Sequence, residues 1–255
     1  MGSIVNRPGI NGDIVHLERD GFGNILVLED RKHRMLSFDS IFEQSKIALA
    51  APHLPVHEYS RAMLLPAAFA TPGHVTVLGL GGGALAHGLY RLFPDCQVHV
   101  VELREKVVNV ARQWFGLPDD PRLSITVDDA ADTVANLPPG STDMIFTDLY
   151  SANRMSPTQA QRRFIKHCCR ALTDDGWLIL NYHKVPDESG SLFRELVRQF
   201  PCLLYFRSRS NNTVIYGCRQ PFYPWPLDVP YLKELEQQLP VGWRKLMKKL
   251  TLVEG

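Results

Sequence analysis

Hydrophobic and polar positions alternate with two different periods between residues 75 and 185. Short apolar runs of strand length occur at 75–80, 97–102, 123–127, 143–148 and 177–182. Between them, at 83–93, 105–115, 130–136 and 158–172, apolar residues recur three or four positions apart, which favours helices. Strands that alternate with helices in this way predict a parallel sheet covered by helices on both faces.

The segment before this unit has shorter apolar runs separated by turn residues. Runs at 14–17, 25–28 and 35–38 flank Gly21-Phe22-Gly23-Asn24 and Asp30-Arg31-Lys32, which predicts a small antiparallel sheet of hairpins. At 41–51 and again at 59–69 the apolar spacing favours helices that link this sheet to the larger unit.

After the fifth strand, a helix is expected at 191–199 and two strands at 203–208 and 213–218, joined by the polar link 209–212. An antiparallel edge hairpin of this kind is typical of class I methyltransferase sheets. We therefore expect an α/β fold with a class I methyltransferase-like (Rossmann-like) seven-stranded sheet, preceded by a small N-terminal β-hairpin domain. The expected divisions are an N-terminal region at 1–65, a cofactor-binding catalytic domain at 66–220 and a Pro-rich, helical C-terminal extension at 221–255.

Composition favours small-molecule chemistry. Lys and Arg number 28 against 27 Asp and Glu, so no overall field attracts nucleic acid or an anionic membrane. The five cysteines lack metal-ligand spacing, and no stretch approaches the roughly 20 apolar residues of a membrane span. We expect a soluble, cytoplasmic protein without a metal. The basic residues Lys245, Lys248 and Lys249 could contact RNA or a membrane, or form a solvated helix face.

A glycine-rich loop follows the first strand of the large unit. Gly79-Leu80-Gly81-Gly82-Gly83-Ala84 lies between this strand and a predicted helix, where glycine lets the backbone turn sharply and approach a ligand. Glu102 ends the next strand about 20 residues later, where its carboxylate can accept hydrogen bonds from both hydroxyls of a ribose. A tight turn and a surface glutamate are the structural alternatives.

Two further acidic residues end successive strands. Asp129 follows the third strand and Asp148 the fourth, and ligands of open parallel sheets bind beyond the carboxyl ends of the strands. We therefore expect Glu102, Asp129 and Asp148 to converge on one crevice with the glycine loop. Asp129 could bind the exocyclic amine of adenine or cap a helix, and Asp128 could exchange roles with it.

The runs VLGLGGGALAHGLYRLFPDCQVHVVEL, VVNVARQWFGLPDDPRL and DMIFTDLY resemble the spermidine synthase family of polyamine aminopropyltransferases. The resemblance extends from about residue 24 to residue 218 and includes Phe42-Glu43-Gln44. It implies an aminopropyl transferase, expected as a homodimer, that uses an S-adenosyl sulfonium cofactor and an amine or other nucleophilic acceptor. The cofactor would be S-adenosylmethionine or its decarboxylated form, which leave S-adenosylhomocysteine or methylthioadenosine as products.

The resemblance also implies individual roles. Asp148 would orient and deprotonate the acceptor, with Tyr150 as a second catalytic candidate, and Gln44 and Ser151 would contact the substrate. His183 could serve near the acceptor or only make a structural hydrogen bond. The implied cofactor-binding residues are Gly79, Gly81, Gly82, Gly83, Glu102, Leu103, Asp129 and Ala130.

Two positions depart from the family pattern. Ala84 stands where the family's glycine loop carries the Asp that binds the ammonium of the decarboxylated cofactor, and Ser151 stands where a second Asp helps to bind a diamine. Loss of a charged hydrogen bond, about 1.5 to 3 kcal/mol, removes the discrimination against the carboxylate of ordinary S-adenosylmethionine. The sequence thus leaves three alternatives: a methyltransferase with an unknown acceptor, a non-catalytic cofactor-binding protein, and an NAD-dependent oxidoreductase. The run of three glycines, Asp129 and the edge hairpin argue against the last.

Overall fold

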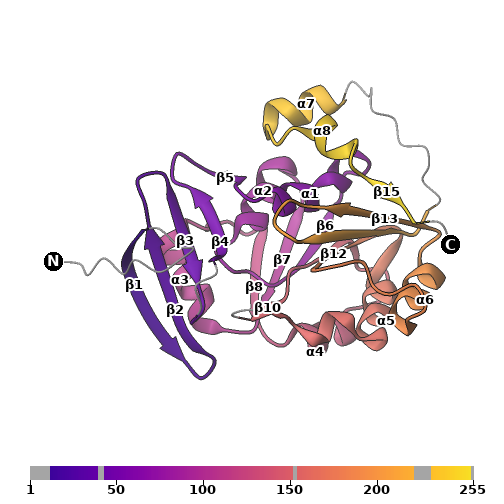
Figure 1. Ribbon diagram of the computed structural model, residues 1–255, viewed down its shortest axis with the longest axis horizontal. Coiled ribbons are helices and arrows are strands. Elements are labelled where there is room, and N and C mark those ends of the chain that lie inside the picture. Colours follow the sequence, from indigo (N-terminus) through magenta and orange to yellow (C-terminus); the bar gives the residue numbers. More distant parts are fainter. Residues whose placement is uncertain (1–11, 40–42, 152–153, 221–230, 254–255) are drawn as a thin grey trace.

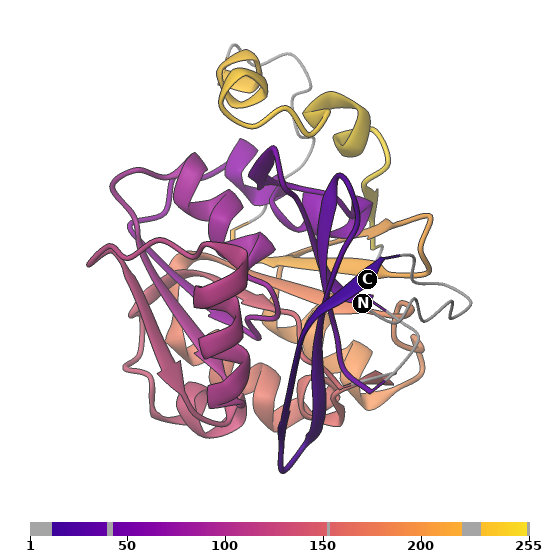
Figure 2. The same ribbon diagram turned by 90° about the vertical axis from the view of Figure 1, so that its left-hand side faces the viewer.

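The computed structural model describes residues 12–39, 43–151, 154–220 and 231–253. Its first strands form a five-stranded antiparallel sheet in which each strand pairs with the next along the chain. Figure 2 shows this sheet standing across one end of the molecule. The strands are β1 (Asp13–Asp20), β2 (Gly23–Glu29), β3 (His33–Ser37), β4 (Glu43–Ala48) and β5 (Ala51–Pro55).

A larger sheet forms the centre of the molecule, with strand order β15-β13-β14-β12-β9-β6-β7-β8 (Figure 1). The pairs among β12, β9, β6, β7 and β8 are parallel, and β14, β13 and β15 add antiparallel strands at one edge. The strands are β6 (His74–Leu78), β7 (Gln97–Glu102), β8 (Leu123–Val127), β9 (Thr142–Thr147), β12 (Leu172–Tyr182), β13 (Cys202–Arg207), β14 (Thr213–Cys218) and β15 (Thr251–Leu252). A short hairpin of β10 (Tyr150–Ser151) and β11 (Arg154–Met155) follows β9.

Helices cover both faces of this sheet, as the strand and helix periods predicted. On β9, Met144 and Phe146 pack into one hydrophobic cluster and Ile145 into the other, which is the alternation expected of a strand buried on both faces. The first cluster includes residues of α1 (Glu58–Met63), the 3-10 helix η1 (Leu65–Ala68), α2 (Ala84–Leu92), α7 (Tyr231–Gln238) and α8 (Trp243–Met247). The second includes residues of α4 (Ala130–Asn136), α5 (Arg162–Ala171) and α6 (Ser191–Gln199), and the 3-10 helix η2 (Pro157–Ala160) precedes α5.

The helix α3 (Glu105–Phe115) joins the two sheets. Its residues Val107, Val110 and Phe115 are buried against the N-terminal sheet, whereas Val108 and Ala111 belong to the core of the large sheet. Because one helix packs against both layers, the N-terminal sheet is held beside the carboxyl ends of β6 and β7.

The helix expected at 41–51 is wrong. The described part of this segment forms β4 and β5, and β4 pairs antiparallel with β3. Ser45 and Ile47, two residues apart, are buried, so the segment has the period of a strand. Tertiary pairing with β3 therefore overrides the local apolar spacing. The second expected helix, at 59–69, is present as α1 and η1.

The large sheet has one strand more than the seven expected, because the end of the chain returns as β15 and pairs with β13. The described residues of the C-terminal segment, 231–253, also pack against the large sheet. Leu235, Leu239 and Trp243 are fully buried in the main hydrophobic cluster. The Lys248 side chain is exposed, while Lys249 Nζ lies 2.7 Å from Glu58 Oε1.

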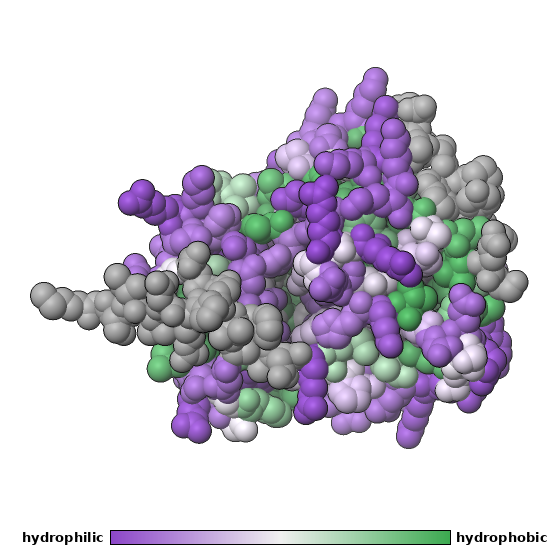
Figure 3. All heavy atoms as spheres, viewed as in Figure 1, coloured by the Kyte–Doolittle hydropathy of each residue, from purple (hydrophilic) through white to green (hydrophobic). Residues whose placement is uncertain are grey.

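Hydrophilic residues dominate the face seen in Figure 3, and hydrophobic residues there form only small patches. Among the residues that the structure describes, no helix has the length and apolar character needed to cross a bilayer.

Candidate active site

A cavity of about 860 Å³ opens where the carboxyl ends of the parallel strands meet the N-terminal sheet. This volume lies in the range of small-molecule sites, about 300 to 1,000 Å³. Ten residues expected at the site line it: Gln44, Gly79, Gly81, Glu102, Leu103, Asp129, Ala130, Asp148, Tyr150 and Ser151. The convergence predicted from the strand ends is therefore present in the structure.

The glycine loop bends tightly between β6 and α2. Gly79 has φ +96°, and a Cβ atom on it would lie 2.4 Å from the carbonyl oxygen of Asp148, so only glycine allows the ends of β6 and β9 to approach this closely. Gly82 and Gly83 do not line the cavity. A Cβ on Gly82 would meet the ring of Phe115, and one on Gly83 would meet Leu117. These two glycines let the loop pack against the structure behind it.

Glu102 is buried at the end of β7, with 8% of its surface exposed. Its Oε2 accepts a hydrogen bond from the N–H of Leu80 at 3.0 Å, and its Oε1 accepts one from the N–H of Arg104 at 3.0 Å. Burial raises the pKa of Glu102, and these backbone donors act in the opposite direction. The N–H of Gly81 is a third backbone donor that lowers this pKa, so about one of the roughly four acceptor positions of Glu102 is left for a hydroxyl group while the carboxylate holds the glycine loop in place.

Asp129 caps helix α4, which is one of the two roles that the sequence left open for it. Its Oδ1 accepts a hydrogen bond from the N–H of Ala131 at 2.7 Å. Asp128 uses both of its oxygens locally, because they accept hydrogen bonds from the N–H of Asp129 and the hydroxyl of Thr133. Of the two acids, Asp129 therefore retains more acceptor capacity toward the cavity.

Asp148 follows β9 and is the acid with the most perturbed pKa at the cavity. Burial raises the pKa of Asp148 to about 6, and a hydrogen bond from Asn181 opposes this rise. Asn181 Nδ2 donates to Asp148 Oδ1 at 2.7 Å. A carboxylate with a pKa near 6 is ionised at neutral pH yet remains basic enough to accept a proton.

Three residues near Asp148 were expected from the sequence. The Tyr150 hydroxyl donates to the carbonyl oxygen of Asn181 at 3.2 Å, and burial, together with Asp148, raises the pKa of Tyr150. Tyr150 therefore stays protonated and can donate a hydrogen bond but cannot act as a base at neutral pH. His183 lines the cavity and packs edge-on against Tyr150, with ring centroids 5.2 Å apart. The Ser151 hydroxyl donates to the carbonyl oxygen of Arg154.

Several lining residues were missed by the sequence reasoning, because no motif marks them. Asn181 and Asn212 form a chain toward Asp148, with Asn212 Nδ2 donating to Asn181 Oδ1 at 3.1 Å. On the N-terminal sheet, Glu43 lies beside the expected Gln44. It forms an ion pair with Lys46 at 3.2 Å, and its Oε1 lies 3.2 Å from Nε2 of His57. Burial lowers the pKa of His57, although Glu43 opposes this effect.

These residues fit an adenosyl group. Gly79 and Gly81 line the cavity with backbone alone, Glu102 has acceptor capacity for a ribose hydroxyl, and Leu103 and Ala130 give apolar surface. Among the described residues, no group of three or more His, Cys, Asp or Glu side chains is arranged to hold a metal ion.

Comparison with known proteins gives a match to the spermine/spermidine synthase domain over residues 53–201. A polyamine aminopropyltransferase of Neisseria meningitidis is 30% identical over 167 residues, which cover 64% of this chain and 63% of that protein. The eEF1A lysine and N-terminal methyltransferase of Homo sapiens is 31% identical over 189 residues, which cover 68% of this chain and 26% of that protein. This chain thus spans less than two thirds of the length of either relative.

Among solved structures, a probable spermidine synthase from Corynebacterium glutamicum superposes with a TM-score of 0.74. The sequence identity is 21%, and the superposition covers 88% of this chain and 86% of the other. This likeness shows that the two proteins share their fold.

Proposed function

Because this chain belongs to the spermine/spermidine synthase family, we propose that it is a transferase that binds an S-adenosyl sulfonium compound and transfers an aminopropyl group to an amine. The sulfonium compound would supply a carbon atom activated by its bond to positively charged sulfur. Glu102 would hold a ribose hydroxyl, and Asp129 would accept a hydrogen bond from the adenine amine. Gly79 and Gly81 would let the loop backbone approach the cofactor.

The single observation that carries this proposal is the environment of Asp148. It lies in the same cavity as the glycine loop and Glu102, and its pKa is raised to about 6 by burial. An amine with a pKa near that of lysine, about 10.4, is protonated at pH 7, and its deprotonation costs about 4.6 kcal/mol. Asp148 would orient the acceptor ammonium and take a proton from it, which frees the nitrogen lone pair to attack the carbon. The carbon–sulfur bond then breaks, and the sulfur leaves as the neutral thioether methylthioadenosine.

A second candidate is methyl transfer from S-adenosylmethionine. Ala84, the first residue of α2, lines the cavity and carries no charge that would repel the carboxylate of this cofactor. Glu43, another acid that lines the cavity, already contacts Lys46 and His57, which leaves it less available to bind the ammonium group of a diamine. The similarity to a lysine and N-terminal methyltransferase supports this candidate as well.

The proposal extends to the setting of the enzyme. All five cysteines are buried thiols, which favours a reducing compartment, and we place the protein in the cytoplasm. Residues 66–220 would form the catalytic domain, with residues 1–65 completing the site and residues 221–255 as an extension. The resemblance to the aminopropyltransferases also leads us to propose a homodimer.

The test is a product analysis. The protein is incubated with putrescine or another amine and with either S-adenosylmethionine or its decarboxylated form, and mass spectrometry follows methylthioadenosine and S-adenosylhomocysteine. Methylthioadenosine formed together with an aminopropylated amine is expected. S-adenosylhomocysteine with a methylated acceptor would instead establish the second candidate, and cofactor binding with no product from any amine would contradict aminopropyl transfer.

Asp148→Asn is the variant that tests the role of the base. We expect turnover to fall by about 10²- to 10⁴-fold, the usual cost of losing a general base, while the Kd of the cofactor changes less than about threefold. Asp132→Asn, an exposed acid on α4, is the matched control. A single-turnover rate within a few-fold of the parent would make Asp148 a structural residue.

A further inference from the structure

Phe22 is a large aromatic residue in an unusual position. It lies in the turn between β1 and β2, and 63% of its surface is exposed. It nevertheless lines the cavity, together with Leu103, which follows Glu102 and is 47% exposed. Two exposed apolar side chains therefore stand at the end of the cavity where Glu102 lies.

An ion pair fixes the turn that carries Phe22. Arg104 Nε lies 2.9 Å from Asp20 Oδ2, and Arg104 Nη2 lies 2.8 Å from Asp20 Oδ1, which is a two-pronged contact. Both side chains are largely buried, with 8% and 14% exposed. Arg104 also donates to the carbonyl oxygen of Gly23, and Asp20 accepts a hydrogen bond from the N–H of Phe22. The turn is therefore held by its backbone as well as by charge.

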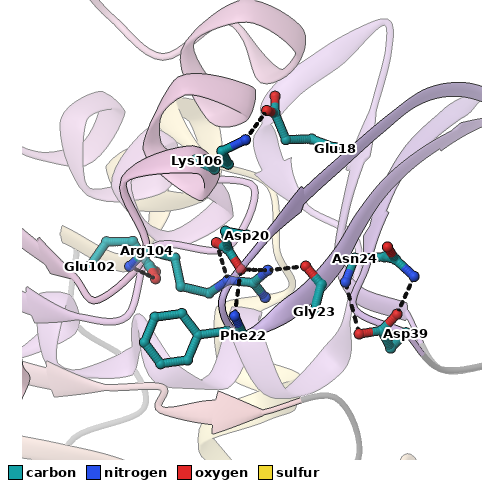
Figure 4. Close-up of polar contacts among 9 residues, drawn as sticks. All are labelled: Glu18, Asp20, Phe22, Gly23, Asn24, Asp39, Glu102, Arg104 and Lys106. Atoms are coloured by element: carbon teal, nitrogen blue, oxygen red, sulfur yellow. Dashed lines mark hydrogen bonds and ion pairs between the residues drawn. The ribbon is translucent and has the colours of Figure 1, made fainter.

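The same arginine connects this turn to Glu102. Its backbone N–H donates to Glu102 Oε1, while its side chain reaches the β1–β2 turn. Figure 4 shows the ring of Phe22 extending from the turn beneath the Arg104 side chain, on the side where Glu102 lies. The guanidinium carbon of Arg104 is 5.9 Å from the centre of this ring and 4.6 Å from that of Phe38. Arg104 thus sets the position of Glu102 and of the aromatic ring together.

We infer that Phe22 forms a wall of the adenosyl subsite and that the Asp20–Arg104 ion pair positions it there. The inference rests on the proposed class of cofactor. An exposed aromatic plane beside a carboxylate with spare acceptor capacity matches a nucleoside, whose flat base is apolar on its faces and whose ribose carries two hydroxyl groups. The N-terminal sheet therefore contributes directly to cofactor binding, although Phe22 lies 80 residues before Glu102 in the sequence.

The experiment measures the Kd of three ligands by calorimetry: S-adenosylmethionine, its decarboxylated form and methylthioadenosine. Phe22→Ala is expected to weaken all three by about tenfold, the scale of losing one base–aromatic stacking contact. The loss should be equal for the three ligands because all three contain the same adenosyl part and differ in their tails. Phe22→Tyr should keep the parent affinity, and Asp20→Asn should weaken binding by about threefold through the turn.

Leu17→Ala is the matched control, because Leu17 is 61% exposed on the same hairpin but does not line the cavity. It should leave all three Kd values unchanged. If Phe22→Ala bound the ligands as the parent does, or lost affinity only for the two with charged tails, Phe22 would not contact the adenosyl group. A parent protein that bound none of the three would refute the proposed cofactor class itself, so the two failures are distinguishable.

Discussion

Asn181 is the residue whose replacement tests the electrostatics of the site most directly. It is 1% exposed, and its Nδ2 donates the 2.7 Å hydrogen bond to Asp148 Oδ1. Asn181→Leu keeps roughly the same volume but removes this donor. The ionised form of Asp148 then loses its stabilising partner, whereas the burial that raises its pKa remains. The pKa of Asp148 should therefore rise above its present value of about 6.

The size of the rise follows from the hydrogen bond. A hydrogen bond to a charged group contributes about 1.5 to 3 kcal/mol, and one pKa unit corresponds to about 1.36 kcal/mol. The expected pKa in the variant is therefore about 7 to 8. Because only the ionised carboxylate can accept a proton from the acceptor, about 90% of the parent but roughly a tenth to a half of the variant would be competent at pH 7.

The assay is the pH dependence of kcat/KM, which reports the pKa values of the free enzyme. The acid limb should move from about pH 6 to higher pH in Asn181→Leu, and the rates should approach the parent value at alkaline pH. Asn212→Ala, which removes only the next donor in the chain, should shift the limb less. The exposed Asn136→Ala is the control without effect. An acid limb at an unchanged pH, with only the plateau lowered, would refute the assignment of this limb to Asp148.

Two further predictions concern charge in the same cavity. Ala84→Asp should weaken the binding of S-adenosylmethionine and strengthen that of its decarboxylated form, so that the ratio of the two affinities shifts by about 2 kcal/mol, or about thirtyfold. The affinity for methylthioadenosine should change little. If calorimetry found unchanged affinity ratios, Ala84 would not face the cofactor tail. Asp148→Asn should stabilise the ligand-free protein at pH 8. The folded pKa of Asp148, about 6, lies above its ordinary value of 3.8, so the parent has its full stability below about pH 4 and loses part of it as the pH rises through 6. A rise of about two pKa units corresponds to about 3 kcal/mol in the free energy of unfolding. Because the Asp148 side chain is half-buried and screened by solvent, the expected gain is about 1 to 2 kcal/mol. Urea denaturation at pH 4 and pH 8 should show the difference only at the higher pH, and an equal difference at both would contradict the prediction.

The candidate site could be predicted from the sequence to the extent that it is built from strand ends. The glycine loop, Glu102, Asp129 and Asp148 each follow an apolar run of strand length, and the carboxyl ends of parallel strands meet at one edge of a sheet. The convergence of these residues therefore follows from local patterns and one topological rule. The pKa of Asp148 does not, because it depends on burial and on Asn181, 33 residues away.

The same distinction holds for the elements outside the parallel sheet. Residues 41–51 have an apolar spacing that suits a helix, and only the pairing of β4 with β3 makes the described part of this segment a strand. Residues 251–252 become β15 only because β13 offers an unpaired edge.

The sequence by itself determined the class of the fold and the acids at the strand ends, because hydrophobic periodicity records how each segment is buried. Only the tertiary structure decided which distant side chains complete the site. Phe22 comes to the cavity through Asp20 and Arg104, which are 84 residues apart. Contacts across such a separation depend on how α3 packs between the two sheets, and no local pattern of residues encodes that packing.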